Sequence, residues 1–112
     1  MDLETLEPSE RDLIGQCLRA SATGPFFPDW EFSTLFGLER VEVRAIAAVW
    51  PGVGNRESAE LAINNSLNHL VGYPHSCDGI WSQWISAPPK ELLRLLSKLR
   101  GAPPTSYFDA LR

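Results

Sequence analysis

The sequence predicts an all-α fold: a single compact domain of about five helices around a buried central helix at about residues 39–50. Apolar residues recur at the three- and four-residue spacing of helices. Gly and Pro follow the apolar runs, as they do at helix ends. No Asn-Gly or Asp-Gly dipeptide joins two alternating apolar runs, as a β-hairpin would require. A length of 112 residues fits one domain, so we expect residues 1–112 to fold as a single helical unit.

The first helix is expected over about residues 10–22. Ser9 is a suitable N-cap with Asp12 three residues later, which is a short version of the capping box. Gly24 is a natural stop for this helix. Residues 1–8 are acidic, and we expect them to form a flexible N-terminus.

Two further helices are expected before the middle of the chain. A short one over about 29–36 begins with Asp29 as its cap and ends at Gly37, in the C′ position. The next runs over about 39–50 and is ended by Pro51. Its second half, AIAAVW, is apolar on every side, which is typical of a buried helix. We therefore place it at the centre of the domain.

The second half of the chain continues the helical pattern. Asn55 is expected to cap a helix over about 56–71. An irregular connection follows, in which residues 80–85 could form one helical turn. A leucine-rich helix is expected over 89–100, beginning at a proline pair. The remaining tail, 102–112, could add a short docked helix.

Composition narrows the class of protein. Acidic residues outnumber basic ones, 14 to 10, and the net charge of −4 argues against a strong general affinity for nucleic acid or anionic lipid. No apolar run approaches the roughly 20 residues that span a bilayer, so we expect no membrane association. The acidic start, MDLETLEPSE, lacks the apolar region of a secretory signal and indicates a cytoplasmic protein. Two cysteines are too few for a disulfide scaffold.

Aromatic residues gather in and beside the irregular segments. The stretch GPFFPDWEFSTLFG, residues 24–37, holds five of the eleven aromatic residues. Phe32 and Phe36 lie one helical turn apart and are expected to pack inward. Aromatic side chains in connectors can be offered to solvent, where Trp and Tyr are enriched at binding hot spots. The residues expected to bind a partner are Phe26, Phe27, Trp30, Glu31, Tyr73, His75, Asp78 and Trp81.

The segment from 29 to 46 resembles a loose helix-turn-helix motif. The positions that carry the resemblance are Ser33, Gly37, Val43 and Ile46. It implies a DNA-binding regulator that would use Arg40 and Arg44. Two glutamates on the same helix cancel these charges, whereas DNA-binding domains usually show a basic footprint.

A small metal- or thiol-dependent enzyme is a third class. His69, His75, Cys77 and Asp78 all have side chains that can bind zinc, but their spacing matches no familiar zinc pattern. Cys77 beside His75 suggests a nucleophile with a base, yet no third, orienting group is identifiable. We expect no metal, no cofactor and no catalytic residue.

Two stretches, FFPDWEFSTLFGLER and LVGYPHSCDGIW, resemble segments of small bacterial single-domain proteins without an assigned role. In size and acidity the chain is also similar to immunity proteins and antitoxins. The net charge, the aromatic connectors and the absence of a complete catalytic set predict a non-enzymatic, protein-binding module. An immunity- or antitoxin-type inhibitor, or a regulatory adaptor that neutralises a partner protein, would fit this prediction. Self-association through the helix at 89–100 is a further option.

Overall fold

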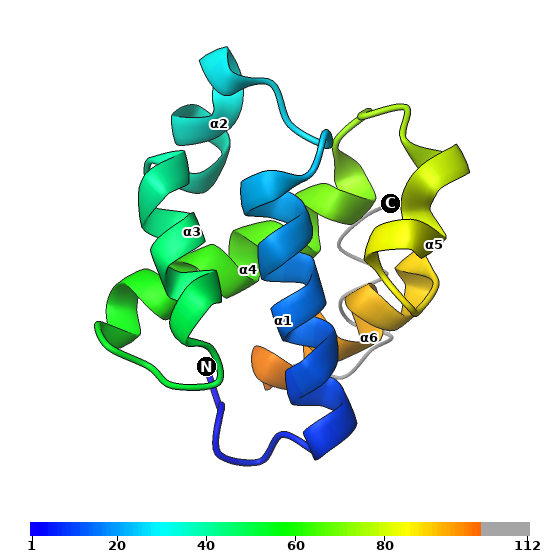
Figure 1. The fold of residues 1–112 in the computed structure, drawn as a ribbon. Helices are drawn as coiled ribbons and strands as arrows, with labels where there is room; N and C mark the ends of the chain where they lie inside the picture. Colours follow the sequence, from blue (N-terminus) through cyan, green and yellow to red (C-terminus); the bar gives the residue numbers. More distant parts are fainter. Residues whose placement is uncertain (102–112) are drawn as a thin grey trace.

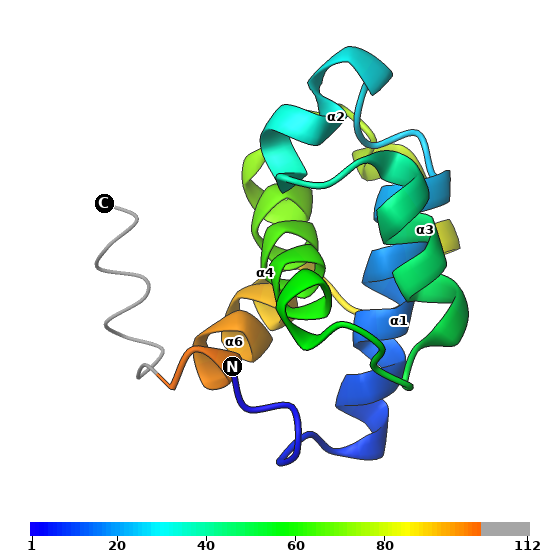
Figure 2. The ribbon, with the colours of Figure 1, turned by 90° about the vertical axis from the view of Figure 1, so that its left-hand side faces the viewer.

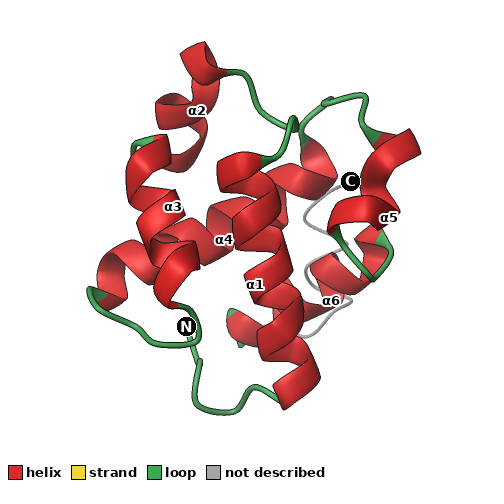
Figure 3. Ribbon diagram, in the orientation of Figure 1, coloured by secondary structure: helices red, strands yellow, loops and turns green. Residues whose placement is uncertain are grey.

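The computed structural model describes residues 1–101, and the expected tail at 102–112 lies outside them. This part of the chain contains helices and no strand, which confirms the all-α prediction (Figures 1 and 3). None of its helices combines the length and apolar character that crossing a bilayer requires. The elements are α1 (Pro8–Thr23), α2 (Asp29–Phe36), α3 (Arg40–Val49), α4 (Arg56–Gly72), the 3₁₀-helix η1 (Asp78–Ile80), α5 (Trp81–Trp84) and α6 (Pro89–Leu99).

Helix α4 runs through the middle of the domain. It packs against α1, α2, α3 and α6, and α1 in turn packs against α3 and α5 (Figures 1 and 2). Its inward face is fully apolar apart from one serine. The buried residues of this face are Ala59, Ala62, Ile63, Ser66, Leu67 and Leu70.

The prediction that the helix at 39–50 is the buried centre is wrong. Val43 is the only fully buried side chain of α3, whereas Val41 and Val49 are 65% and 59% exposed. Alanines make up much of this apolar run, and a surface helix exposes their small side chains at little cost. Apolar composition therefore wrongly predicted a central position for a helix that has one buried side, packed mainly against α1.

The N-terminal residues are packed, which differs from the flexible segment expected at 1–8. Leu3 and Leu6 are buried in the core. The Arg56 guanidinium of α4 binds the Glu4 carboxylate at 2.6 Å and the Met1 carbonyl at 3.0 Å. These contacts fasten the chain start to the beginning of α4.

Helix α1 begins earlier than expected, with Glu7 rather than Ser9 as N-cap. Glu7 and Glu10 form a reciprocal capping box. Glu10 is buried and also receives a hydrogen bond from the Lys98 ammonium of α6 at 2.7 Å. Burial favours the neutral carboxyl, but the hydrogen bonds from Lys98 and from the Glu7 N–H outweigh it, so the pKa of Glu10 lies below its ordinary value. The acidic end of α1 is thereby joined to the basic face of α6.

Candidate functional site

The aromatic connector between α1 and α2 is core, so the prediction that it binds a partner is wrong. Phe26 and Phe27 are 1% and 4% exposed, and Trp81 is also buried. The Phe26 ring lies edge-on to His75 at 4.9 Å and to Trp81 at 6.0 Å. The Phe27 ring lies 5.5 Å from that of Tyr73. The prolines hold the connector extended, so that the Phe26 ring packs toward α5 and the Phe27 ring packs between α2 and α4.

Phe32 and Phe36 pack inward as expected. Both are buried, and their rings stack at 4.3 Å. Their aromatic neighbours are Phe27, which touches both, and the His69 ring beside Phe36. The His69 Nε2 also makes a 2.8 Å hydrogen bond with the Leu35 carbonyl. The end of α2 is thus sealed onto α4.

The expected partner residues Trp30, Glu31 and Tyr73 lie on α2 or at the end of α4, and each keeps part of its surface exposed. Trp30 on α2 is 78% exposed. Glu31 and Tyr73 are half-buried, and the Tyr73 hydroxyl donates a hydrogen bond to the Glu31 carboxylate. This bond to a carboxylate raises the pKa of Tyr73 above its ordinary value. Glu31 and Tyr73 therefore satisfy each other and tie α2 to the end of α4, while Trp30 is free to meet a partner.

The geometry around His75 leaves the Cys77 thiol without a base. The Cys77 backbone N–H donates to His75 Nδ1 at 2.9 Å, so the proton resides on Nε2, which donates to the Leu70 carbonyl at 2.9 Å. The Cys77 Sγ contacts the His75 carbonyl oxygen, not the ring. Asp78 is exposed at the start of η1. Residues 1–101 hold no group of three His, Cys, Asp or Glu side chains placed to share a metal ion.

Arg40 has a structural role. Its Nη1 donates to the carbonyls of Ser21 and Ala22 at 3.2 and 3.3 Å, and its Nη2 to that of Phe27 at 2.7 Å. The first two carbonyls belong to the last turn of α1, where helix geometry leaves them without partners. Arg40 therefore caps α1 from a neighbouring helix.

Asp29 also interacts with the Arg40 guanidinium. This residue makes no capping bond to α2, contrary to the prediction, and instead pairs with Arg40 Nε at 3.0 Å. The Arg40 guanidinium also lies 4.3 Å from the centre of the Phe32 ring. Of the two arginines expected to bind DNA, only Arg44 projects into solvent.

An exposed apolar surface covers the outer side of α3 and the loop that follows. Val41 and Val49 are joined by Val53, which is 41% exposed, and by two exposed alanines. Positions 41, 45, 48 and 49 share one side of the helix. A shallow pocket of about 260 Å³ adjoins them and is lined by residues from 45 to 59. We call this surface the α3 apolar face; its members are Val41, Ala45, Ala48, Val49 and Val53.

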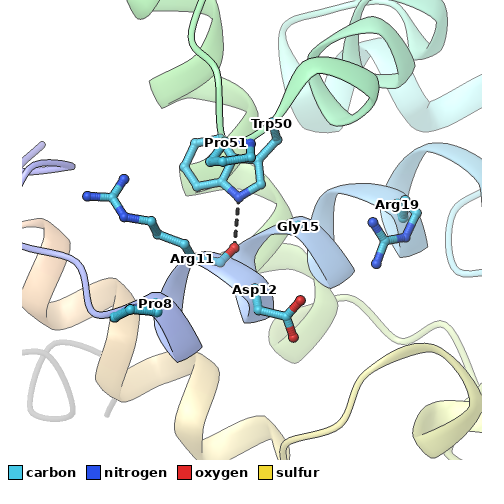
Figure 4. A pocket seen from close by; sticks show the side chains of 7 residues that line it. All are labelled: Pro8, Arg11, Asp12, Gly15, Arg19, Trp50 and Pro51. Atoms are coloured by element: carbon cyan, nitrogen blue, oxygen red, sulfur yellow. Dashed lines mark hydrogen bonds between the residues drawn. The ribbon is translucent and has the colours of Figure 1, made fainter.

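A second hollow, which we call the Trp50 pocket, lies between α1 and the end of α3 (Figure 4). It has a volume of about 330 Å³. The Trp50 indole forms one wall, and its Nε1–H donates to the Arg11 carbonyl at 2.7 Å. Sequence reasoning missed this pocket, although Gly15 in the middle of a helical pattern was a usable signal. The lining residues are Pro8, Arg11, Asp12, Gly15, Arg19, Trp50 and Pro51.

No family model, curated protein or solved structure matches the chain. A functional proposal therefore rests on the surfaces of the protein alone.

Proposed function

We propose that this chain is a protein-binding module and that its partner docks on the α3 apolar face. One observation carries the proposal. Five large apolar side chains of residues 1–101 are exposed, and three of them, Val41, Val49 and Val53, belong to this face. Gathered apolar side chains on a soluble domain are typical of interaction sites, whereas single ones are ordinary.

The charges beside the face indicate the chemistry of the partner. Glu39 and Glu42 are exposed at the start of α3, where they form a reciprocal capping box. The whole chain carries a net charge of −4. A complementary surface would present apolar side chains flanked by Lys or Arg, and opposite charges would speed the encounter. An immunity- or antitoxin-type inhibitor of a basic protein is the specific form of this proposal.

The helix-turn-helix alternative has weaker support. Binding to DNA depends on cations that neutralise phosphates. Arg40 is occupied by carbonyls of α1 and by Asp29, so Arg44 is the cation that α3 can offer. Beside Arg44 stand the two capping glutamates, which would repel a phosphate backbone.

A pair of charge-matched variants tests the proposal. Val41→Glu with Val49→Glu places two carboxylates on the α3 apolar face. Ser33→Glu with Thr34→Glu adds the same charge at exposed positions of α2. Wild type and both variants are immobilised and exposed to extract of the native cell. A protein retained by wild type is then purified, and its Kd for each form is measured by calorimetry.

We expect the α3 pair to weaken binding at least 100-fold and the α2 pair to leave it within about threefold, since truncating a few central contacts removes most interface energy. Equal affinity for wild type and the α3 pair would refute the proposal. Retention of wild type on a DNA column at low salt, lost in Arg44→Met, would instead favour the DNA-binding alternative.

A further inference from the structure

We propose that the Trp50 pocket binds a small anion carried on a planar ring, such as an aryl phosphate or aryl carboxylate. The anionic group would be held by Arg19, with Arg11 at the far end, and the ring would lie against the Trp50 indole. This site is independent of the α3 apolar face, because the two sets of lining residues do not overlap.

Two arginines mark the ends of the pocket (Figure 4). Arg11 and Arg19 lie on the same side of α1, eight residues apart, which corresponds to about 12 Å along the helix. Within residues 1–101 neither guanidinium has a hydrogen-bond or ion-pair partner, in contrast to Arg40 and Arg56. The hydrogen bond from Arg56 lowers the pKa of Glu4, and the Arg11 charge contributes to this lowering. Arg19 is therefore the cation of the two pocket arginines that is placed to hold an anion.

Gly15 lies between these arginines on α1 and leaves room for the Trp50 indole. A Cβ atom at this position would lie 3.1 Å from Trp50 Cδ1 and 4.0 Å from Arg19 Nη1. The indole edge therefore packs directly on Gly15, and the Arg19 guanidinium lies beside it. A ligand beside the indole would meet an aromatic surface and a cation together.

Asp12, the one acidic residue that lines the pocket, is hydrogen-bonded within α1. The Asp12 carboxylate accepts a hydrogen bond from Gln16 Nε2 at 2.9 Å. The Gln16 Oε1 in turn accepts from the Ser86 N–H at 2.7 Å. Two arginines and one aspartate leave the pocket with a net positive charge, which favours an anion.

The dimensions and rigidity of the pocket select the ligand class. A volume of about 330 Å³ is at the low end for ligand sites, so one ring with one anionic group fits better than a dinucleotide. The hydrogen bond from Trp50 Nε1 to the Arg11 carbonyl fixes the indole before any ligand arrives. Arginine forms paired hydrogen bonds with phosphate and carboxylate oxygens and stacks on aromatic rings.

Phenyl phosphate is the first probe, titrated into the ¹⁵N-labelled protein. We expect saturable shifts of the Gly15 amide and Trp50 indole N–H signals with a Kd on the order of 1 mM. Inorganic phosphate lacks the ring and phenol lacks the phosphate, so each should bind at least tenfold more weakly than phenyl phosphate. Benzoate tests the carboxylate class in the same way.

Two arginine variants make the test specific. Arg19→Met should weaken phenyl phosphate binding at least tenfold, and Arg44→Met, which removes an exposed arginine outside the pocket, should leave it unchanged. The proposal is overturned by no saturation up to about 20 mM, by equal binding of inorganic phosphate, or by equal losses in both variants. Unchanged binding in the Val41→Glu/Val49→Glu protein separates this site from the proposed protein interface.

Discussion

Arg40→Met is the substitution with the clearest expected effect on the fold. Arg40 donates to three backbone carbonyls, and two of them, from Ser21 and Ala22, end α1. Methionine keeps much of the apolar stem but removes every donor. If the guanidinium caps α1 as described, its loss should destabilise the whole domain rather than α3 alone.

The magnitude follows from the contacts. A hydrogen bond to a charged group contributes about 1.5–3 kcal/mol. The 2.7 Å bond to the Phe27 carbonyl merits that range, whereas the two at 3.2 and 3.3 Å share one nitrogen and together merit about 1 kcal/mol. The Asp29 carboxylate is 93% exposed, so its ion pair adds less than about 0.5 kcal/mol. We expect a loss of about 3 kcal/mol in the free energy of unfolding.

Urea unfolding followed by circular dichroism measures this loss, with the slope of the transition unchanged. At about 4–8 °C per kcal/mol for a domain of this size, Tm should fall on the order of 15 °C. Arg40→Lys keeps the charge but not the planar fork, so it should recover less than half of the loss. Arg44→Met, one turn along α3, should stay within about 0.5 kcal/mol of wild type. An Arg40→Met protein as stable as the Arg44→Met protein would refute the capping role.

Three more predictions concern titration and reactivity. The hydrogen bond to Glu31 raises the pKa of Tyr73, so the contribution of this bond to the stability of the fold should be present below about pH 10 and should be lost as pH rises through the raised pKa. Glu31→Gln should lower the pKa of Tyr73, measured by a tyrosinate absorbance titration. The pKa of Glu10 is lowered, so the contribution of its carboxylate to the stability of the fold should be present above about pH 4.3 and should be lost on further acidification. In acid unfolding, the Glu10→Gln protein should lack this part of the pH dependence. Burial raises the pKa of Cys17, so a thiol reagent should modify only Cys77 in the native protein; rapid modification of both would contradict the packing.

Local signals in the sequence predicted the elements well. Gly37 was expected to close a helix, and it has the left-handed φ of 69° that favours glycine. Asn55 was expected to cap α4, and its side chain accepts from the Ser58 N–H. Both features depend on residues within a few positions of one another, and such short-range chemistry can be read from the sequence directly.

Long-range contacts could not be predicted in this way. Arg40 meets carbonyls 13 to 19 residues earlier, and no spacing rule indicates which arginine will do so. Phe26 and Phe27 were misjudged because an extended connector can either cover a core or project from it. The burial of α3 was misjudged because composition does not distinguish an alanine-rich surface helix from a buried one.

Helix α3 is fastened to α1 at both of its ends. Arg40 joins its first residue to the last turn of α1, and the Trp50 indole, immediately after its last residue, joins the Arg11 carbonyl near the start of α1. A surface helix held in this way cannot fray from either end without releasing a bond to its neighbour. In native-state hydrogen exchange, the amides of α3 should therefore open together with those of α1, as one cooperative unit.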